Sequence, residues 1–407
     1  MKENTIPPNT LTDPAKLIRT VCYCLSFVSL GLVTSSLGPT LPGLAENTQS
    51  QFREISYLFT ARSFGYLLGS FLGGRLYDRL AGHAVMGSAL LVMALTMTLA
   101  PLIPLLLLLV LVLLILGMAE GTLDVGGNTL LVWLHRHKVG PFMNALHFAF
   151  GVGAFLGPVI IAQVLLRSGG ITWAYWTLAL LVIPSALWLL ALSSPPIQTI
   201  AEDGSTGQVN YLLILLIALF FFLYVGAEVG FGGWVFSYAT ALNLTDEATA
   251  AYLTSAFWGS LTLGRLLAIP IAARLRPRTI LFGDLVLCML SIAIILIWSA
   301  SLTAVWIAAI GLGLGMASIF PVTLSFAERR MPISGRVTGF FFVGSSLGGM
   351  TVPWMIGQLF ESIGPAVAMW IIAVDLVAAL LLLIILILYS GRVRVLEIEL
   401  DQPPVPS

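Results

Sequence analysis

The stretch PLLLLLVLVLLILGMAEGTLDVGGNTL, residues 104–130, decides the fold class. Its first half is entirely apolar, and the whole stretch exceeds the roughly 20 residues that a helix needs to cross a bilayer. Glu120, Asp124 and Asn128 then follow at four-residue spacing, which places them on one face of a helix. Because a charge inside a bilayer is costly, these groups are expected to face a cavity or a partner. The stretch therefore predicts a membrane helix with one functional polar face.

The composition of the whole chain agrees with this interpretation. Of 407 residues, 58% are hydrophobic and 9% are charged, whereas a soluble domain carries roughly 25% charged residues. The formal net charge is zero, so no nucleic-acid partner is indicated. No ATP-binding loop or soluble domain is recognisable, and we expect neither an enzyme nor an ATP-driven pump. The chain is predicted to be a polytopic membrane protein whose partners are the lipid bilayer and a small molecule.

Twelve apolar runs are long enough to span a bilayer. They lie near residues 18–43, 54–78, 81–101, 104–134, 140–167, 171–193, 210–241, 247–273, 278–299, 302–327, 335–362 and 365–390. The polar segment 194–209 contains Pro, Gly, Ser and acidic residues typical of a linker. We therefore expect an N-terminal segment 1–17, a six-helix bundle 18–193, a linker 194–209, a second six-helix bundle 210–390 and a polar, loosely ordered tail 391–407.

The distribution of basic residues orients the spans. Fifteen Lys and Arg residues fall on the side that holds both termini and the linker: Lys2, Lys16, Arg19, Arg75, Arg79, Arg136, Lys138, Arg274, Arg276, Arg278, Arg329, Arg330, Arg336, Arg392 and Arg394. The other side holds only Arg53 and Arg167. Basic loops stay cytoplasmic, so both termini are expected in the cytoplasm. The short linker and compact termini favour a bacterial cytoplasmic (inner) membrane.

The two halves of the chain repeat each other. With a shift of 195 residues, FGVGAFLGPVIIAQV (150–164) falls on the stretch GSSLGGMTVPWMIGQL, which places Pro158 on Pro353 and Gln163 on Gln358. The same shift pairs Gly31 with Gly226, Gly69 with Gly264 and Arg79 with Arg274. Parallel duplicated six-helix halves with a substrate site between them resemble the architecture of the major facilitator superfamily. The expected fold is thus all-α, with 12 transmembrane helices in two pseudo-symmetric halves.

The loop after the second run carries a further resemblance. GGRLYDRLAGH (73–83) is similar to the superfamily's Gly-x-x-x-Asp-Arg-x-Gly signature, although its last glycine comes one residue late, at Gly82. Asp78 and Arg79 fit the signature and are expected to form a gating latch, together with the intramembrane Arg62 and Arg265. These residues bear on fold and gating, not on substrate.

The fourth run carries the candidate coupling site. Asp124 and Asn128, with Ser35 in the first run and Glu120 one turn away, offer oxygen ligands of the kind that suits Na⁺, and Asp124 alone would suit a proton. Gly126 and Gly127 are expected to loosen the helix and free backbone carbonyls for a cation. The alternative is structural, with Asp124 paired to Arg62 or Arg265.

The seventh run carries the candidate sugar site. FFFLYVGAEVGFGGWVFSYAT (220–240) places Tyr224 and Glu228 on one face, and Trp234 extends the aromatic surface. An aromatic ring can stack on the face of a sugar while a carboxylate accepts hydrogen bonds from its hydroxyls. Trp258 in the eighth run and His147 in the fifth are further candidate sugar ligands. His147 could equally be a hydrogen-bonding residue of the core. Ordinary bundle packing would explain the single aromatic residues equally well. Asp284 is expected at the membrane interface, and Asp375 has no assigned role.

A narrower family resemblance follows from these motifs. YVGAEV (224–229) and LDVGGN (123–128) closely resemble the fucose–galactose–proton symporter family. LGPTLPGL (37–44), ARSFGYLLGSFLGG (61–74), ALHFAFGVGAFLGP (145–158) and TSAFWGSLTLGRLLAIP (254–270) are most similar to its sodium-dependent glucose transporter branch. The resemblance implies hexose uptake with a cation, Asp124 being the coupling acid, Asn128 its polar neighbour and Glu228 the acid of span seven.

One departure from the proton-coupled type bears on the ion. That type carries a second acid in span one, where this chain has Gly38 and only hydroxyl side chains nearby, which favours Na⁺ over H⁺. The sequence thus predicts a monomeric transporter that imports a glucose-like hexose by symport with Na⁺ and needs no cofactor. Two alternatives remain open: a proton-coupled sugar symporter, and an exporter of drugs or metabolites with the same fold.

Overall fold

The computed structural model describes residues 13–197, 210–331 and 335–400, and nearly all of them are helical. Most of the expected linker and of the expected N-terminal segment lies outside these ranges, so those boundaries stay predictions. The first bundle contains α1 (Asp13–Thr34), α2 (Leu37–Asn47), α3 (Phe52–Ile55), α4 (Tyr57–Tyr77), α5 (Gly82–Leu99), η1 (Ala100–Leu102), α6 (Leu106–His135), η2 (Arg136–Lys138), α7 (Val139–Ser168) and α8 (Ile171–Ala191).

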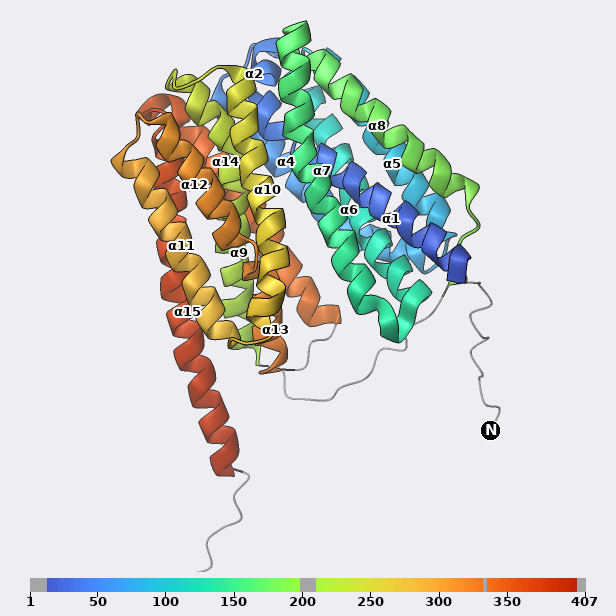
Figure 1. Ribbon diagram of the computed structural model, residues 1–407, viewed down its shortest axis with the longest axis vertical. Helices are drawn as coiled ribbons and strands as arrows, with labels where there is room; N and C mark the ends of the chain where they lie inside the picture. The colour runs from blue at the N-terminus through green and yellow to red at the C-terminus, as the bar shows by residue number, and fades with distance from the viewer. Residues whose placement is uncertain (1–12, 198–209, 332–334, 401–407) are drawn as a thin grey trace, which may run out of the picture.

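The second bundle repeats this arrangement, and Figure 1 shows the two side by side. It contains α9 (Tyr211–Ala241), α10 (Glu247–Ala272), α11 (Pro277–Ile297), α12 (Leu302–Met316), α13 (Ile319–Glu328), α14 (Gly335–Ile363) and α15 (Val367–Leu400). The bundles meet where α4 packs on α14 and where α7 packs on α10. The all-α fold with two six-helix halves is confirmed.

Eleven helices within the described residues are long and apolar enough to cross a membrane. The twelfth expected span is present as α4, a helix of 21 residues. Arg62, Arg75 and several glycines lower the hydropathy of α4, which packs on α6 and α14. The expected tail differs from the structure, since α15 continues as a helix through Leu400, past residue 390. The Leu, Glu and Arg residues of this segment are good helix formers.

Two of the twelve spans are interrupted. The first span breaks into α1 and α2 at Ser35 and Ser36, and the tenth breaks into α12 and α13 at Ala317 and Ser318. At the first break the Ser35 and Ser36 hydroxyls donate to carbonyls of the preceding turn, at 3.0 Å to Gly31 and 2.7 Å to Val33. Such bonds compete with the backbone hydrogen bonds of the helix. Both interruptions border the cavity described below.

The expectation of a loosened fourth span is wrong, because α6 runs without a break across Gly126 and Gly127. These glycines instead make room for neighbouring rings. A Cβ on Gly126 would lie 2.0 Å from Tyr77 Oη, and one on Gly127 would lie 2.0 Å from Phe27 Cε2. The space that the glycine pair creates is therefore filled by side chains, and the helix keeps its own hydrogen bonds.

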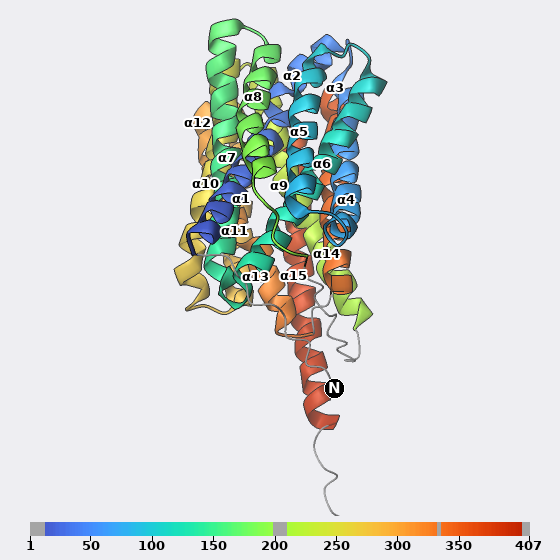
Figure 2. The ribbon, with the colours of Figure 1, turned by 90° about the vertical axis from the view of Figure 1, so that its right-hand side faces the viewer.

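The molecule has two distinct ends. We call the end where α8 finishes and α9 begins the linker face, and the end that carries α2 and α3 the distal face (Figures 1 and 2). At the distal side the halves touch closely: a Cβ on Gly38 of α2 would lie 2.6 Å from the carbonyl oxygen of Gly232 in α9. The halves are thus closed against each other toward the distal face.

Candidate functional site

A cavity of about 740 Å³ lies between the two halves. Arg62 and Glu120 line its inner end, and Leu275, Pro277 and Arg329 line it where it reaches the linker face. Because the distal side is closed and the linker side is not, the structure is in the conformation that opens toward the linker face. The cavity is large enough for a small polar molecule of the size of a sugar.

Glu120 and Arg62 form a buried ion pair at the inner end of the cavity. Arg62 Nη2 lies 2.5 Å from Glu120 Oε1, and Arg62 Nε donates to Glu120 Oε2 at 2.8 Å. Arg62 also donates to the carbonyls of Thr34 at 3.1 Å and Val33 at 3.0 Å, at the break between α1 and α2. The backbone carbonyls at that break therefore accept hydrogen bonds from the guanidinium. All of these bonds lie within the N-terminal half, so the latch role of Arg62 between the halves stays a prediction, and the charge of Glu120 is already balanced.

Asp124, one turn after Glu120 on α6, has a different environment. It makes no ion pair within the described part of the chain; Tyr66 Oη donates to Oδ2 at 2.7 Å, and Asn128 Nδ2 donates to Oδ1 at 3.3 Å. Asn128 Nδ2 also donates to the backbone carbonyl of Asp124 at 2.9 Å. The pairing of Asp124 with Arg62 or Arg265, which the sequence left open, is not present. A carboxylate held by two neutral donors in a membrane cavity can accept a monovalent cation without first losing an ion pair.

Tyr66 is the residue that sequence reasoning missed. It lies on α4 one turn after Arg62, so both side chains point toward α6, where Glu120 and Asp124 are also one turn apart. The signal was present in ARSFGY (61–66), because residues four apart share a helix face. What the sequence does not contain is the packing of α4 on α6, which matches Arg62 to Glu120 and Tyr66 to Asp124.

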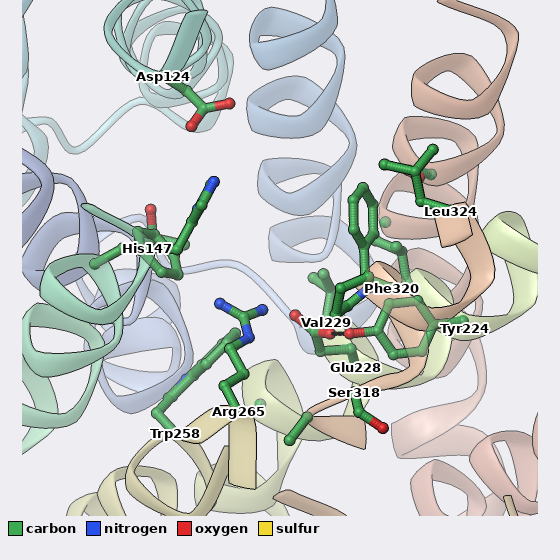
Figure 3. Close-up of a pocket in the computed structure, with 18 of the residues that line it drawn as sticks. Asp124, His147, Tyr224, Glu228, Val229, Trp258, Arg265, Ser318, Phe320 and Leu324 are labelled. Carbon is green, nitrogen blue, oxygen red and sulfur yellow. Dashed lines mark hydrogen bonds between the residues drawn. The ribbon is translucent and has the colours of Figure 1, made fainter. Parts of the chain in front are cut away.

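Glu228 lies across the cavity from Asp124, on α9 (Figure 3). Its carboxylate accepts a hydrogen bond from Tyr224 Oη, one turn earlier on the same helix. Figure 3 shows the Arg265 guanidinium directed into the space between His147 and Glu228. Arg265 forms neither a hydrogen bond nor an ion pair within the residues that the structure describes, so its donors point into the cavity. Arg265 thus lines the cavity and does not extend toward the membrane surface.

Three further candidates line the same cavity. His147 on α7 makes an edge contact with Phe27, with ring centroids 6.0 Å apart. Trp258 on α10 is 6% exposed, and its indole lies over Gly232. Ser35 is buried, and its hydroxyl donates to the carbonyl of its own helix. These residues surround the carboxylates with aromatic and hydroxyl groups, the combination that suits a neutral polyhydroxylated ligand.

Trp234 does not line the cavity, in contrast to its expected role as a substrate ligand. It is fully buried on the distal side of α9, where Nε1 donates to the carbonyl of Pro353 at 3.0 Å. Its ring packs against Phe52, Phe59 and Phe360, with centroid distances of 5.7, 6.0 and 4.9 Å. In this conformation Trp234 closes the distal side instead of contacting a ligand.

The remaining charged candidates are not among the residues that line the cavity. Asp78 and Arg79 are exposed at the linker end of α4 and make no side-chain bond to any described residue, so the expected latch is not formed in this conformation. Asp284, expected at the interface, is half-buried and accepts a hydrogen bond from Ser318 at the break of the tenth span. Asp375 on α15 is 8% exposed, and its Oδ2 has no partner among the described residues.

Comparison with known proteins now settles the family. Residues 23–353 match the model of the Major Facilitator Superfamily. The chain belongs to this superfamily. It is therefore an integral membrane transporter of a small molecule, not an enzyme. The similarity also extends to one branch: sodium-dependent glucose transporter 1 of Xenopus laevis is 32% identical over 353 residues, which cover 79% of this chain and 72% of the relative.

Solved structures support the same fold. The nucleoside transporter NupG, in a mutant form, aligns with a TM-score of 0.74 at 16% identity and covers 91% of this chain and 99% of its own. A D-xylose–proton symporter aligns with a TM-score of 0.72 at 14% identity, covering 90% and 97%. At these identities the structures show the fold alone. The resemblance to the superfamily and to its sodium-dependent glucose transporter type is thus confirmed by the family model and the sequence relative.

Proposed function

We propose that this superfamily member imports a hexose, glucose-like in structure, by symport with Na⁺. The observation that carries the proposal is Asp124, a carboxylate in the cavity that only neutral donors hold. The sodium-dependent glucose transporter name of its relatives supports the choice of substrate and ion. The transporter would act as a monomer, with no cofactor.

In this proposal Na⁺ binds at Asp124. Carboxylate and amide oxygens are ligands that hard cations prefer, so rotation of the Asn128 amide would offer an oxygen beside the Asp124 carboxylate. Ser35 at the break of span one would supply a further oxygen. Glu120 keeps its place among the candidate coupling residues, although its pairing with Arg62 favours a structural part in the site.

The sugar would lie between the two halves. Glu228 would accept hydrogen bonds from its hydroxyls while Arg265 donates to others, and Trp258 or Tyr224 would cover the apolar face of the ring. Asn128 and His147 would contact it from the N-terminal half. A ligand that touches both halves favours the closure of one half on the other, which is what alternating access requires.

Coupling would follow from the charge of Asp124. When the halves close around an empty site, the carboxylate must be buried without a counterion, and such burial is strongly unfavourable. Bound Na⁺ removes that net charge and allows closure. With the linker face in the cytoplasm of a bacterial inner membrane, as the Lys and Arg distribution predicts, the structure would be the inward-facing state that releases sugar and ion into the cell.

The test is uptake of labelled glucose into liposomes that contain the purified protein, at fixed pH. An inward Na⁺ gradient is compared with an equal K⁺ gradient, for the parent and for Asp124→Asn. We expect accumulation only with Na⁺ and only in the parent, whereas Asp124→Asn still exchanges labelled for unlabelled sugar. Glu247→Gln, at the exposed start of α10, is the matched control and should accumulate like the parent.

Other results would change specific parts of the proposal. Equal uptake in both salts, increased by an inward proton gradient, would make Asp124 a proton carrier and overturn the choice of Na⁺. Accumulation by Asp124→Asn would remove its coupling role. Absence of glucose transport under every gradient would overturn the hexose assignment, and transport of bulky apolar compounds would then favour an exporter.

A further inference from the structure

The distal closure contains two glutamines that the sequence repeat relates to each other. Gln163 on α7 and Gln358 on α14 are 195 residues apart, the offset that relates the two halves throughout. Each lies near the distal end of the fifth span of its own half. Neither lines the cavity, so substrate binding does not explain why both halves have glutamine here.

Each glutamine bonds to the opposite half. Gln163 Nε2 donates to Tyr252 Oη on α10. Gln358 Nε2 donates to the carbonyl of Arg53 at 2.8 Å, and Arg53 Nε donates back to Gln358 Oε1 at 3.2 Å. The Gln358 amide also donates to Ser56 Oγ at 3.2 Å. Both glutamines therefore connect the two bundles by side-chain hydrogen bonds.

The partners of the glutamines are related by the same repeat. Tyr252, at the start of the second span of the C-terminal half, is 195 residues after Tyr57, at the start of the second span of the N-terminal half. Tyr57 follows Ser56 and packs against Trp354, one turn before Gln358, with ring centroids 6.3 Å apart. Each glutamine thus meets the start of the second span of the other half, in agreement with the pseudo-twofold axis.

We propose that Gln163 and Gln358 are the distal gate residues of the transport cycle, a pair of clasps that hold the distal side shut and must open when the cavity turns to that side. Beside the Gln358 clasp, Trp234 packs against Phe52, Phe59 and Phe360 and forms an apolar layer toward the cavity. The glutamine bonds are exposed to solvent, so water can replace them when the halves separate. Exposed hydrogen bonds contribute little net free energy, which suits contacts that form and break in every cycle.

A second contact strengthens the clasp at Gln358. The backbone N–H of Phe52 donates to Glu361 Oε1 at 2.9 Å, one turn beyond Gln358 on α14. No equivalent of this bond is described beside Gln163. Removal of the Gln358 amide is therefore expected to open the distal side less than removal of the Gln163 amide, because Glu361 still connects the halves.

The test measures the distance between the halves and needs no substrate, so its outcome is independent of the hexose and Na⁺ assignments. Spin labels are placed at Glu46→Cys on α2 and Glu247→Cys on α10, both exposed at the distal side, after Cys22, Cys24 and Cys288 are replaced by Ala. Pulsed electron paramagnetic resonance then gives the distance distribution in lipid nanodiscs. Gln163→Leu, Gln358→Leu and the double variant are compared with the parent.

We expect a longer-distance population that grows about fivefold for Gln163→Leu and less for Gln358→Leu, and in the double variant by about the product of the two single effects, because independent losses multiply the opening equilibrium. Thr177→Val on α8 removes a hydroxyl that bonds only within its own helix, and it is the control that should match the parent. Gln→Asn variants keep the amide but shorten its reach; they should shift the population the same way, and they replace the Leu variants if those do not fold.

An unchanged distance distribution in the folded double variant would overturn the proposal. So would an equal shift with Thr177→Val, since the effect would then be general loosening of the bundle.

Discussion

Two acids one turn apart on α6 have different surroundings. Glu120 is held by the Arg62 guanidinium, whereas Asp124 is held by a phenol and an amide. The sequence placed both on one face and predicted that this face borders a cavity or a partner, and both acids do line the cavity. It left open which acid pairs with an arginine, because a helical spacing fixes the face of α6 but not the register of α4 against it. Tyr66 was missed for the same reason.

Removing one partner of the Arg62–Glu120 pair should destabilise the protein. In Glu120→Gln the buried guanidinium loses its counterion and keeps only neutral acceptors, the two backbone carbonyls and the new amide oxygen, and breaking a buried pair in this way costs about 3–5 kcal/mol. The double variant Arg62→Met with Glu120→Gln removes the unpaired charge and should lose less stability than the single variant. Thermal melting of the purified variants in detergent measures both.

The same variants distinguish the two roles of Glu120. Glu120→Gln could instead melt like the parent while its glucose accumulation no longer depends on Na⁺. Glu120 would then be a coupling residue, and the ion pair would contribute little to stability.

At the scale of the helices, hydropathy and repeats predicted most of the architecture. The number of spans, their order and the duplication follow from apolar runs and the 195-residue offset, because membrane helices must satisfy their backbone internally and so leave a clear sequence signal. The positions of the helix breaks could not be predicted from hydropathy or from the repeat. Glycines 126 and 127 suggested a break in α6, yet the breaks lie at Ser35–Ser36 and Ala317–Ser318. Glycine can permit either a break or a close contact, and only the neighbouring helix decides between them.

Helix crossings at glycine are a testable consequence at this scale. A Cβ on Gly117 of α6 would lie 2.0 Å from the carbonyl oxygen of Arg62 on α4, so Gly117→Ala must push the two helices apart. Overpacking of this kind costs about 1–3 kcal/mol, and it would also disturb the neighbouring ion pair. Gly283→Ala on α11 is the matched control, because its Cβ would meet no atom within 4 Å and alanine is the better helix former. We expect Gly117→Ala to melt at a lower temperature than the parent, and Gly283→Ala to melt at the same temperature or higher. Equal melting of both variants would mean that the α4–α6 contact is not tight.

At the scale of the whole molecule, the structure adds the state of the transporter, which the sequence could not provide. One sequence must encode both the state that opens to the linker face and the state that opens to the distal face. A pattern such as the aromatic run of α9 is therefore compatible with either state. Trp234 illustrates this: its sequence neighbourhood suggested a ligand, but its place depends on which side is closed. In the present state it lies within the distal closure.

The direction of access gives the last prediction. Ser325 on α13 lines the cavity toward the linker face, and Ser56 is fully buried in the distal closure. With the native cysteines replaced, Ser325→Cys should react with a membrane-impermeant thiol reagent in inside-out vesicles and not in right-side-out vesicles. Ser56→Cys should react slowly with the reagent in both orientations, since the halves cover it.

The assay tests both the orientation predicted from the Lys and Arg residues and the side on which the cavity is open. Labelling of Ser325→Cys from the outside would reverse the orientation, whereas rapid labelling of Ser56→Cys from the outside would show that the distal side is open at rest in the membrane. If Ser325→Cys is labelled from the inside and added glucose with Na⁺ slows that labelling, closure of the linker side is coupled to the ligands.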